Sequence, residues 1–376
     1  MIYLDNSATT RIHPEVFEAM LPYLQEEYGN PSSKFYSLAE NAKKAVKHAR
    51  EQVAELLGCE PDEIVFTSGA TESNNMIIKG VQDFYGRQPG SNNYMITSQV
   101  EHPSIIETFH YLAERGTNVR FLDVDSYARI HVDELEQELK EQPLLTSIMW
   151  GNNEIGSLNP IVEIAELFKE TGLFLHTDAT QVIGKVPVSM RDMPDIGFLS
   201  MSGHKIGGPK GIGAAVVRKQ SKEIYTKLTP LIHGGGQENN YRSGTLAVHN
   251  IVGLGKAAEL ARKHLNENIA KLEELESYLI NLLSESLGDK IKFNSDSQNK
   301  IPGLVSLQFI GVNNELLLKR LSPFIALSSG SACSSSKPSH VLSAAGKSLQ
   351  EIRQTIRITL SPDLNKEDLD IFGQIK

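Results

Sequence analysis

The sequence predicts an α/β protein with a largely parallel central sheet and a second, smaller α+β domain. Three observations lead to this fold class. Short apolar runs alternate with amphipathic stretches of helical period up to about residue 255. Beyond that point a long charged helical stretch is followed by short strands and helices. The length of 376 residues also favours two cores over one. We therefore expect a large domain at residues 15–255 and a small one formed by residues 1–14 and 256–376.

In the large domain, residues 40–57 place apolar side chains on one face at helical spacing, and Gly58 follows them. This pattern predicts an amphipathic helix that ends at the glycine. A strand is expected at 63–67, then a strand-to-helix turn at 68–73 and a helix from 74 to 80. The further strands expected here are, in chain order, 94–97, 119–122, 146–149, 174–176, 196–201 and 214–217, with helices such as 161–171 between them.

In the small domain, residues 255–287 are charged, have helical period and predict one long, mildly broken helix. The elements expected after it are strands at 303–309, 325–328 and 355–360 and helices at 315–321 and 339–345.

The composition limits the kinds of partner. A formal net charge of −9 provides no general attraction to nucleic acid or to an anionic membrane. The N-terminus lacks a basic region followed by an apolar stretch, and no apolar run is long enough to span a bilayer. Two cysteines, Cys59 and Cys333, do not form a disulfide framework, and no motif of metal-ligand spacing is found. We expect a cytoplasmic protein without a metal.

Ligands of open parallel sheets bind at the carboxyl ends of the strands, so the residues there are the candidates for chemistry. Gly69-Ala70-Thr71 opens a helix, and its backbone N–H groups and hydroxyl could bind a phosphate. A plain helix cap is the alternative. His102 follows the strand at 94–97 and could stack on a planar ring or move protons, although a surface-loop histidine would look the same.

Two later strand ends carry further polar groups. Asn153 follows the strand at 146–149, where a turn is the competing explanation for the asparagine. Asp178 ends an apolar strand, where a charge is costly without a partner such as a protonated pyridine nitrogen. Capping of a helix is the alternative for Asp178. Gln181 could reach an oxygen on the same ring.

The segment Ser202-Gly203-His204-Lys205 lies between a buried strand and a glycine-rich run. A partly desolvated lysine there can lose its proton and attack a carbonyl to form a Schiff base. Ser202 and His204 could bind a phosphate at the same time. A solvated lysine in a turn is the ordinary reading of Lys205 alone. Together, however, the strand ends supply what pyridoxal 5′-phosphate (PLP) requires: a phosphate site, a stacking imidazole, a pyridinium partner and an amine.

Two residues of the small domain add chemistry. Cys333 lies in a serine-rich stretch ended by Pro338, which favours an accessible nucleophile over an inert core thiol. Arg357 lies in an otherwise apolar or hydroxylic strand, where a guanidinium needs an anion such as a substrate carboxylate. An incidental loop thiol and an exposed-face arginine are the alternatives.

At this point the chain resembles the cysteine desulfurases of the class V aminotransferase group, from Tyr3 to about Leu360. The resemblance implies a PLP enzyme of fold type I, with a seven-stranded, mainly parallel sheet. The motifs that carry it are Gly29-Asn30-Pro31-Ser32-Ser33, Thr67-Ser68-Gly69-Ala70-Thr71-Glu72-Ser73-Asn74, Asn152-Asn153-Glu154-Ile155-Gly156, Ser202-Gly203-His204-Lys205, Arg242-Ser243-Gly244-Thr245 and Ser329-Gly330-Ser331-Ala332-Cys333.

The resemblance also implies roles for individual residues. The cofactor-binding residues would be Ala70, Thr71, His102, Asp178, Gln181, Ser202, His204, Lys205 and, reaching the other subunit of a homodimer, Thr245. Asn153 and Arg357 would bind the substrate carboxylate. Lys205 and His102 would move protons, and Cys333 would take the sulfur.

The implied reaction converts L-cysteine to L-alanine and leaves the sulfur on Cys333 as a persulfide for an acceptor protein. Iron–sulfur scaffolds, tRNA-thiolating enzymes and DNA sulfur-modification systems are the kinds of acceptor that the resemblance suggests. A selenocysteine lyase, another PLP-dependent class V enzyme such as an aminotransferase, and a non-catalytic scaffold of the same fold are the alternatives.

Overall fold

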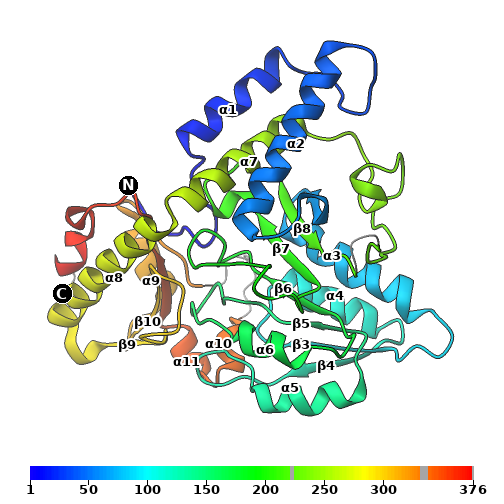
Figure 1. Cartoon of the computed structure of the whole chain (residues 1–376). Helices are drawn as coiled ribbons and strands as arrows, with labels where there is room; N and C mark the ends of the chain where they lie inside the picture. Colours follow the sequence, from blue (N-terminus) through cyan, green and yellow to red (C-terminus); the bar gives the residue numbers. More distant parts are fainter. Residues whose placement is uncertain (221–223, 331–337, 375–376) are drawn as a thin grey trace.

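The computed structural model describes residues 1–220, 224–330 and 338–374, and Figure 1 shows the whole chain. Its centre is a seven-stranded sheet in the order β2-β8-β7-β6-β5-β3-β4. All pairs are parallel except those of β8, which runs antiparallel to both of its neighbours. The predicted sheet is thus confirmed. Its strands are β2 (Ile64–Thr67), β3 (Tyr94–Ser98), β4 (Asn118–Leu122), β5 (Leu145–Ser147), β6 (Leu175–Asp178), β7 (Phe198–Ser202) and β8 (Gly213–Val217).

Helices cover both faces of this sheet, as they must where connections are of the strand–helix–strand kind. Adjacent residues of one strand therefore enter different apolar clusters: Phe198 joins one and Leu199 the other. The helix predicted at 40–57 is confirmed and ends at Gly58, whose φ of +66° is a conformation that favours glycine. The helices of this part are α2 (Ser37–Leu57), α3 (Ala70–Val81), α4 (Pro103–Ala113), α5 (Val132–Glu138), α6 (Ile161–Leu167) and α7 (Val248–Lys263).

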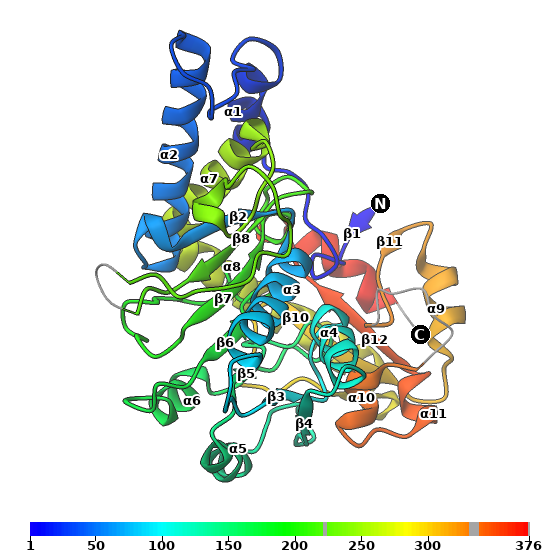
Figure 2. The same cartoon turned by 90° about the vertical axis from the view of Figure 1, so that its right-hand side faces the viewer.

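A smaller antiparallel sheet, in the order β12-β10-β9, lies beside the large one (Figure 2). Leucines 272, 275, 279 and 283 of α8 share an apolar cluster with Leu307 and Ile356 of this sheet. The elements are α8 (Leu265–Leu287), β9 (Ile291–Phe293), β10 (Leu304–Phe309), α9 (Asn314–Leu321), β11 (Ile325–Ala326), α10 (His340–Ala344), α11 (Leu349–Ile352) and β12 (Thr355–Thr359). The predicted α+β region is therefore confirmed.

The helix predicted at 255–287 is in fact two helices. His264, with φ −103° and ψ 10°, separates α7 from α8. The break lets the two helices serve different partners, since Leu254 of α7 belongs to the core of the large sheet and Leu275 of α8 to that of the small one. None of the helices in the described residues is long and apolar enough to cross a membrane.

The N-terminal segment joins the two sheets. Its strand β1 (Ile2–Tyr3) pairs in parallel with β11 in a separate two-stranded sheet, and Asp5 then forms a bridge to Thr359 of β12 in the small sheet. The chain then passes from the small sheet toward the turn after β7, where Thr10 hydrogen-bonds with His204 O at 2.9 Å. Helix α1 (Pro14–Gln25) follows and stands with α2 and α7 at one end of the molecule (Figure 1). The boundaries of the domains at residues 15 and 255 stay a prediction.

Candidate active site

A cavity of about 480 Å³ opens at the carboxyl ends of the parallel strands, where the sequence predicted a ligand site. Ten of the predicted residues line it: Ala70, Thr71, His102, Asn153, Asp178, Gln181, Ser202, His204, Lys205 and Arg357. Thr245 is not among the described residues that line the cavity of its own chain. Cys333 lies outside the described residues.

Lys205 ends the short turn after β7 and extends toward the N-terminal segment. Its Nζ donates to the backbone oxygen of Ala8 at 2.8 Å and to that of Ser7. Burial and, secondly, the charge of Arg357 lower the pKa of Lys205 from 10.5 to about 8. An amine with this pKa is partly unprotonated near neutral pH, as a nucleophile or a base must be.

Asp178 ends β6 and is only 5 % exposed. Its Oδ1 accepts from the backbone N–H of Thr180 at 3.0 Å within a turn, and no helix lies in the fully described stretch between β6 and β7 for Asp178 to cap. Its Oδ2 accepts from the amide of Asn74 at 2.9 Å. The carboxylate is thus fixed by two donors at the edge of the cavity and is available as the partner of a cationic ring.

His102 is the residue before helix α4 and caps it. Its Nδ1 accepts from the backbone N–H of Ser104 at 3.1 Å and lies 2.9 Å from the Ser104 hydroxyl. Burial, against the opposing charge of Asp178, lowers the pKa of His102. The neutral imidazole is therefore the form that faces the cavity at physiological pH.

One end of the cavity fits a phosphate. Gly69 precedes α3 with φ +151° and supplies no side-chain cap, so the first N–H groups of this helix are left for a ligand. Ser202 and His204 lie nearby, and burial followed by the charge of Lys205 lowers the pKa of His204 to about 4. Lys210 also lines the cavity, although sequence reasoning missed it. A cation in the glycine-rich run after β7 was the available signal.

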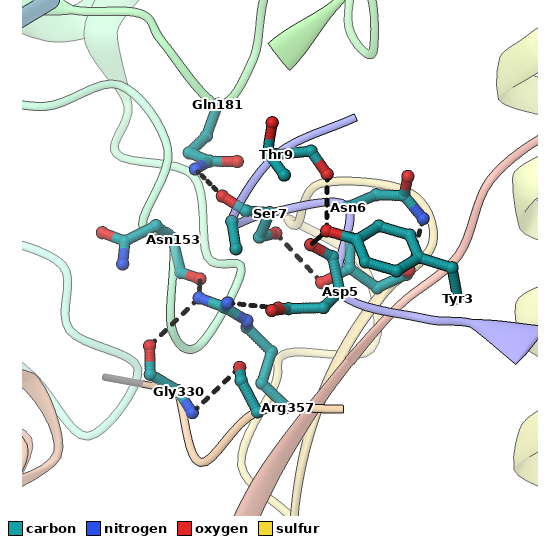
Figure 3. Close-up of polar contacts among 12 residues, drawn as sticks. Tyr3, Asp5, Asn6, Ser7, Thr9, Asn153, Gln181, Gly330 and Arg357 are labelled. Carbon is teal, nitrogen blue, oxygen red and sulfur yellow. Dashed lines mark hydrogen bonds and ion pairs between the residues drawn. The ribbon is translucent and has the colours of Figure 1, made fainter. Parts of the chain in front are cut away.

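Gln181 is held by the N-terminal segment as well. Its Nε2 donates to Ser7 O at 3.0 Å, and its Oε1 accepts from Lys185 at 3.4 Å. The Ser7 oxygen therefore binds both Gln181 and Lys205 (Figure 3 shows the Gln181 contact). The sequence offered no sign that this backbone would form one wall of the site.

Arg357 of β12 is 1 % exposed and already has an anion. Its Nη2 contacts Asp5 Oδ1 at 2.7 Å (Figure 3). Its Nη1 donates to the backbone oxygens of Asn153 at 2.7 Å and Gly330 at 3.0 Å. In the described part of the chain its Nε has no partner. Sequence reasoning expected an anion for Arg357 but missed Asp5, which lies 352 residues away.

This set of groups fits PLP in detail. An amine of lowered pKa, a buried fixed carboxylate and a helix N-terminus open to an anion surround one cavity. The neutral imidazole of His102 lines the same space. No other common cofactor requires these four groups together. The cavity therefore defines a PLP-dependent enzyme.

Comparison with known proteins shows which family the chain resembles. The family model described as aminotransferase class-V matches residues 2–372. The chain is 42% identical to the cysteine desulfurase IscS of Dictyoglomus turgidum, over 98% of this chain and 92% of that protein. A solved NifS-like protein superimposes with a TM-score of 0.91 at 36% identity, covering 99% of this chain and 97% of the other. SspA, solved in complex with cysteine, gives 0.83 at 36% identity, covering 96% and 99%.

The chain therefore belongs to the class V aminotransferase family, whose cofactor is PLP. Within that family it is a cysteine desulfurase.

Proposed function

We propose that Lys205 carries the PLP of this desulfurase and that Cys333 receives the sulfur of L-cysteine. The observation that most strongly supports Lys205 as the residue that carries PLP is its lowered pKa, about 8, in a cavity that also contains Asp178. When bound there, PLP supplies a sink for the electrons released at the substrate Cα. The residues around it bind, orient and move protons.

Each of the ten predicted residues that line the cavity has a place in this proposal. The amine of Lys205 takes the α-proton of the substrate, and Asp178 pairs with the ring nitrogen. Arg357 and Asn153 hold the substrate carboxylate at the opposite side of the cavity. The remaining cofactor contacts are assigned to Ala70, Thr71, His102, Gln181, Ser202 and His204.

The proposal for Cys333 is supported by the two described residues that flank its segment. The carbonyl oxygen of Gly330 accepts from Nη1 of Arg357, which lines the cavity. Ser339 hydrogen-bonds with the carboxyl of Glu154 at 2.5 Å, next to Asn153 in the sequence. Both ends of the segment are thus attached beside the substrate-binding residues.

The sulfur step balances without a further reagent. The thiolate of Cys333 attacks the substrate sulfur, and a new S–S bond forms as the substrate C–S bond breaks. The electron pair of that bond goes to carbon, which takes up a proton, and alanine leaves. A thiol of pKa about 8.5 is only a few per cent ionised at neutral pH, so a nearby base has to accept its proton.

The test is to supply L-cysteine and a reductant and to measure alanine and sulfide together. Wild-type protein should form both in equal amounts, and Cys333→Ser should form neither while it still binds PLP. Cys59→Ser is the matched control, because Cys59 is buried with its pKa raised by burial to about 12. Full alanine formation by Cys333→Ser would refute the persulfide step.

We further propose a homodimer. Apolar side chains of α1 and the loop after it are exposed, among them Phe17 at 50%, Tyr28 at 72% and Phe35 at 98%. Such a face is typical of a subunit interface. Thr245, which does not line the cavity of its own chain, would then reach the phosphate of the other subunit. Light scattering measures the mass, and Thr245→Ala should weaken PLP binding only if the dimer forms.

The sulfur acceptor is proposed only as a class. An iron–sulfur scaffold protein or a tRNA-thiolating enzyme would take the persulfide sulfur from Cys333, in the cytoplasm. Incubation of the protein with ³⁵S-cysteine and each purified acceptor would show which one becomes labelled.

A further inference from the structure

Behind the cavity, a chain of buried polar groups connects Asp178 to His102 through two residues that sequence reasoning did not assign. Asn74 of α3 is 0% exposed and Ser104 of α4 is 9% exposed. The amide nitrogen of Asn74 lies 2.9 Å from Asp178 Oδ2 and 2.9 Å from the Ser104 hydroxyl. That hydroxyl lies 2.9 Å from Nδ1 of His102. The four residues thus form one continuous hydrogen-bonded series.

The direction of every bond in the series follows from the charge of Asp178. A carboxylate only accepts hydrogen bonds, so Asn74 must present its nitrogen and not its oxygen. The second hydrogen on the same nitrogen then points to the Ser104 oxygen. The Ser104 hydrogen is consequently left for Nδ1 of His102, which also accepts from the backbone N–H of Ser104 at 3.1 Å. Two donors at Nδ1 exclude a proton on that atom.

We propose that Ser104 and Asn74 are positioning residues that hold His102 as the neutral imidazole with its proton on Nε2. Of the two ring nitrogens of His102, only Nδ1 is hydrogen-bonded within the described part of the chain, so Nε2 is left for the cavity that His102 lines. His102 therefore offers the cavity a hydrogen-bond donor. It does not offer a base, because the basic nitrogen is Nδ1, behind the ring.

The proton on Nε2 limits what His102 can do in the proposed function, on which this inference rests. The family resemblance implied that His102 moves protons, and a base near the cavity has to accept the proton of Cys333. An imidazole fixed with Nε2–H cannot accept a proton from the cavity side, so that work falls to the amine of Lys205. The series also passes through an amide. Because the amide of Asn74 does not relay protons, no proton passes from His102 to Asp178.

The surrounding charges favour the same state. Burial lowers the pKa of His102, and the nearby Lys205 and His340 lower it further, while Asp178 raises it. The position of His102 at the start of α4 adds the positive end of the helix dipole, which disfavours an imidazolium.

The test is ¹⁵N NMR of the full-length protein labelled at histidine and free of PLP, so that it does not depend on turnover. The signals of His102 are those that disappear in His102→Gln. We expect Nδ1 to be unprotonated and Nε2 protonated at neutral pH. In Ser104→Ala, Nδ1 loses one donor, so the pKa of His102 should rise and its imidazolium should appear at higher pH than in the wild type.

Asn74→Asp tests the direction of the series. A carboxyl at this place would accept the Ser104 hydrogen and turn it away from His102, so the pKa of His102 should rise here too. PLP binding should weaken by about tenfold, because Asp178 loses its amide donor.

His176 provides the matched control within each sample. It is fully buried, and its ring nitrogens lie 2.8 Å from the Ser147 hydroxyl and 3.0 Å from that of Ser200. Unchanged His176 signals would show that a variant is folded, and Ser147→Ala should alter His176 alone.

Wild-type signals with the proton on Nδ1 would overturn the proposal. So would His102 signals and a His102 pKa that stay at wild-type values in folded Ser104→Ala and Asn74→Asp. Neither result would affect the desulfurase assay with Cys333→Ser, which tests the proposed function separately.

Discussion

The two sides of the cavity are built in different ways. The side that includes Asp178 and Lys205 consists of residues at the ends of adjacent strands of one sheet. The side around Arg357 is assembled from β12, the loop with Asn153 and the N-terminal segment with Asp5. The first side would hold the cofactor and the second the substrate. The comparison suggests that the main cofactor contacts come from one sheet, with Lys205 and Gln181 also held by the N-terminal segment. Substrate binding depends on contacts between β12, the loop with Asn153 and that segment.

The largest effect should come from the cofactor side. In Asp178→Ala, the amide of Asn74 and the backbone N–H of Thr180 lose a buried anion. Removing one partner of a buried charged pair costs ~3–5 kcal/mol, so alanine formation should fall by about 100- to 5,000-fold and PLP should bind weakly. The measurement is PLP absorbance titration together with the alanine assay.

Asp296→Ala is the control for this variant, since Asp296 pairs with Arg129 outside the cavity. It should bind PLP as the wild type does. If Asp178→Ala bound PLP normally, Asp178 would not be needed to hold the cofactor, and its assignment to the cofactor side of the cavity would be wrong.

A smaller and different effect is expected on the substrate side. In Arg357→Lys the charge remains, but a lysine cannot reach Asp5, Asn153 O and Gly330 O together. KM for L-cysteine should rise by about 10- to 100-fold, whereas affinity for PLP should stay unchanged. Steady-state kinetics and PLP titration separate the two quantities.

Arg218→Lys is the matched substitution, because Arg218 also bonds to backbone oxygens but lies outside the cavity. It should leave KM unchanged. If affinity for PLP fell in Arg357→Lys by the same factor as KM rose, cofactor and substrate binding would not depend on separate sides of the cavity.

Asp5→Asn tests whether Asp5 and the substrate carboxylate compete for Arg357. Arg357 would lose its internal anion, so the free energy of unfolding should fall by ~1–3 kcal/mol. The carboxylate of a bound amino acid would then be the main anion near the guanidinium. Added L-alanine should therefore raise the melting temperature of Asp5→Asn more than that of the wild type, as measured by calorimetry with PLP present. An equal shift in both proteins would argue against competition between Asp5 and the substrate.

The last effect concerns pH. The folded-state pKa of Lys205, about 8, lies below its ordinary value of 10.5, so the unfolded chain binds more protons between these two values. The stability due to this lysine therefore increases as pH rises from about 8 to 10.5. In the PLP-free protein, the difference in unfolding free energy between Lys205→Met and wild type should shrink over this range. A constant difference would show that burial does not disfavour the Lys205 charge.

The difference between the two sides of the cavity also explains which parts of the fold and site could be predicted from the sequence. Asp178, His102 and Lys205 each follow a short apolar run, and the geometry of a parallel sheet brings such strand ends together. The break at His264 was only partly visible, because both helices share one continuous pattern and differ in what they pack against. Asp5 as the partner of Arg357 could not be predicted, because no local pattern relates residues 352 positions apart. The hydrogen-bonded series through Asn74 was hidden for a similar reason, since it depends on how α3 and α4 pack.

The pairing of β1 with β11, and of Asp5 with Arg357, affects how the protein can fold during its synthesis. The ribosome makes these residues well before their partners, since Arg357 follows Asp5 by 352 residues. At ~5–20 residues per second, roughly 20–70 s pass between the two events. During this time the large sheet can form and the backbone of Ser7 and Ala8 can bind Gln181 and Lys205, but Asp5 still lacks Arg357. The nascent enzyme can therefore acquire its cofactor side before it acquires a place for its substrate.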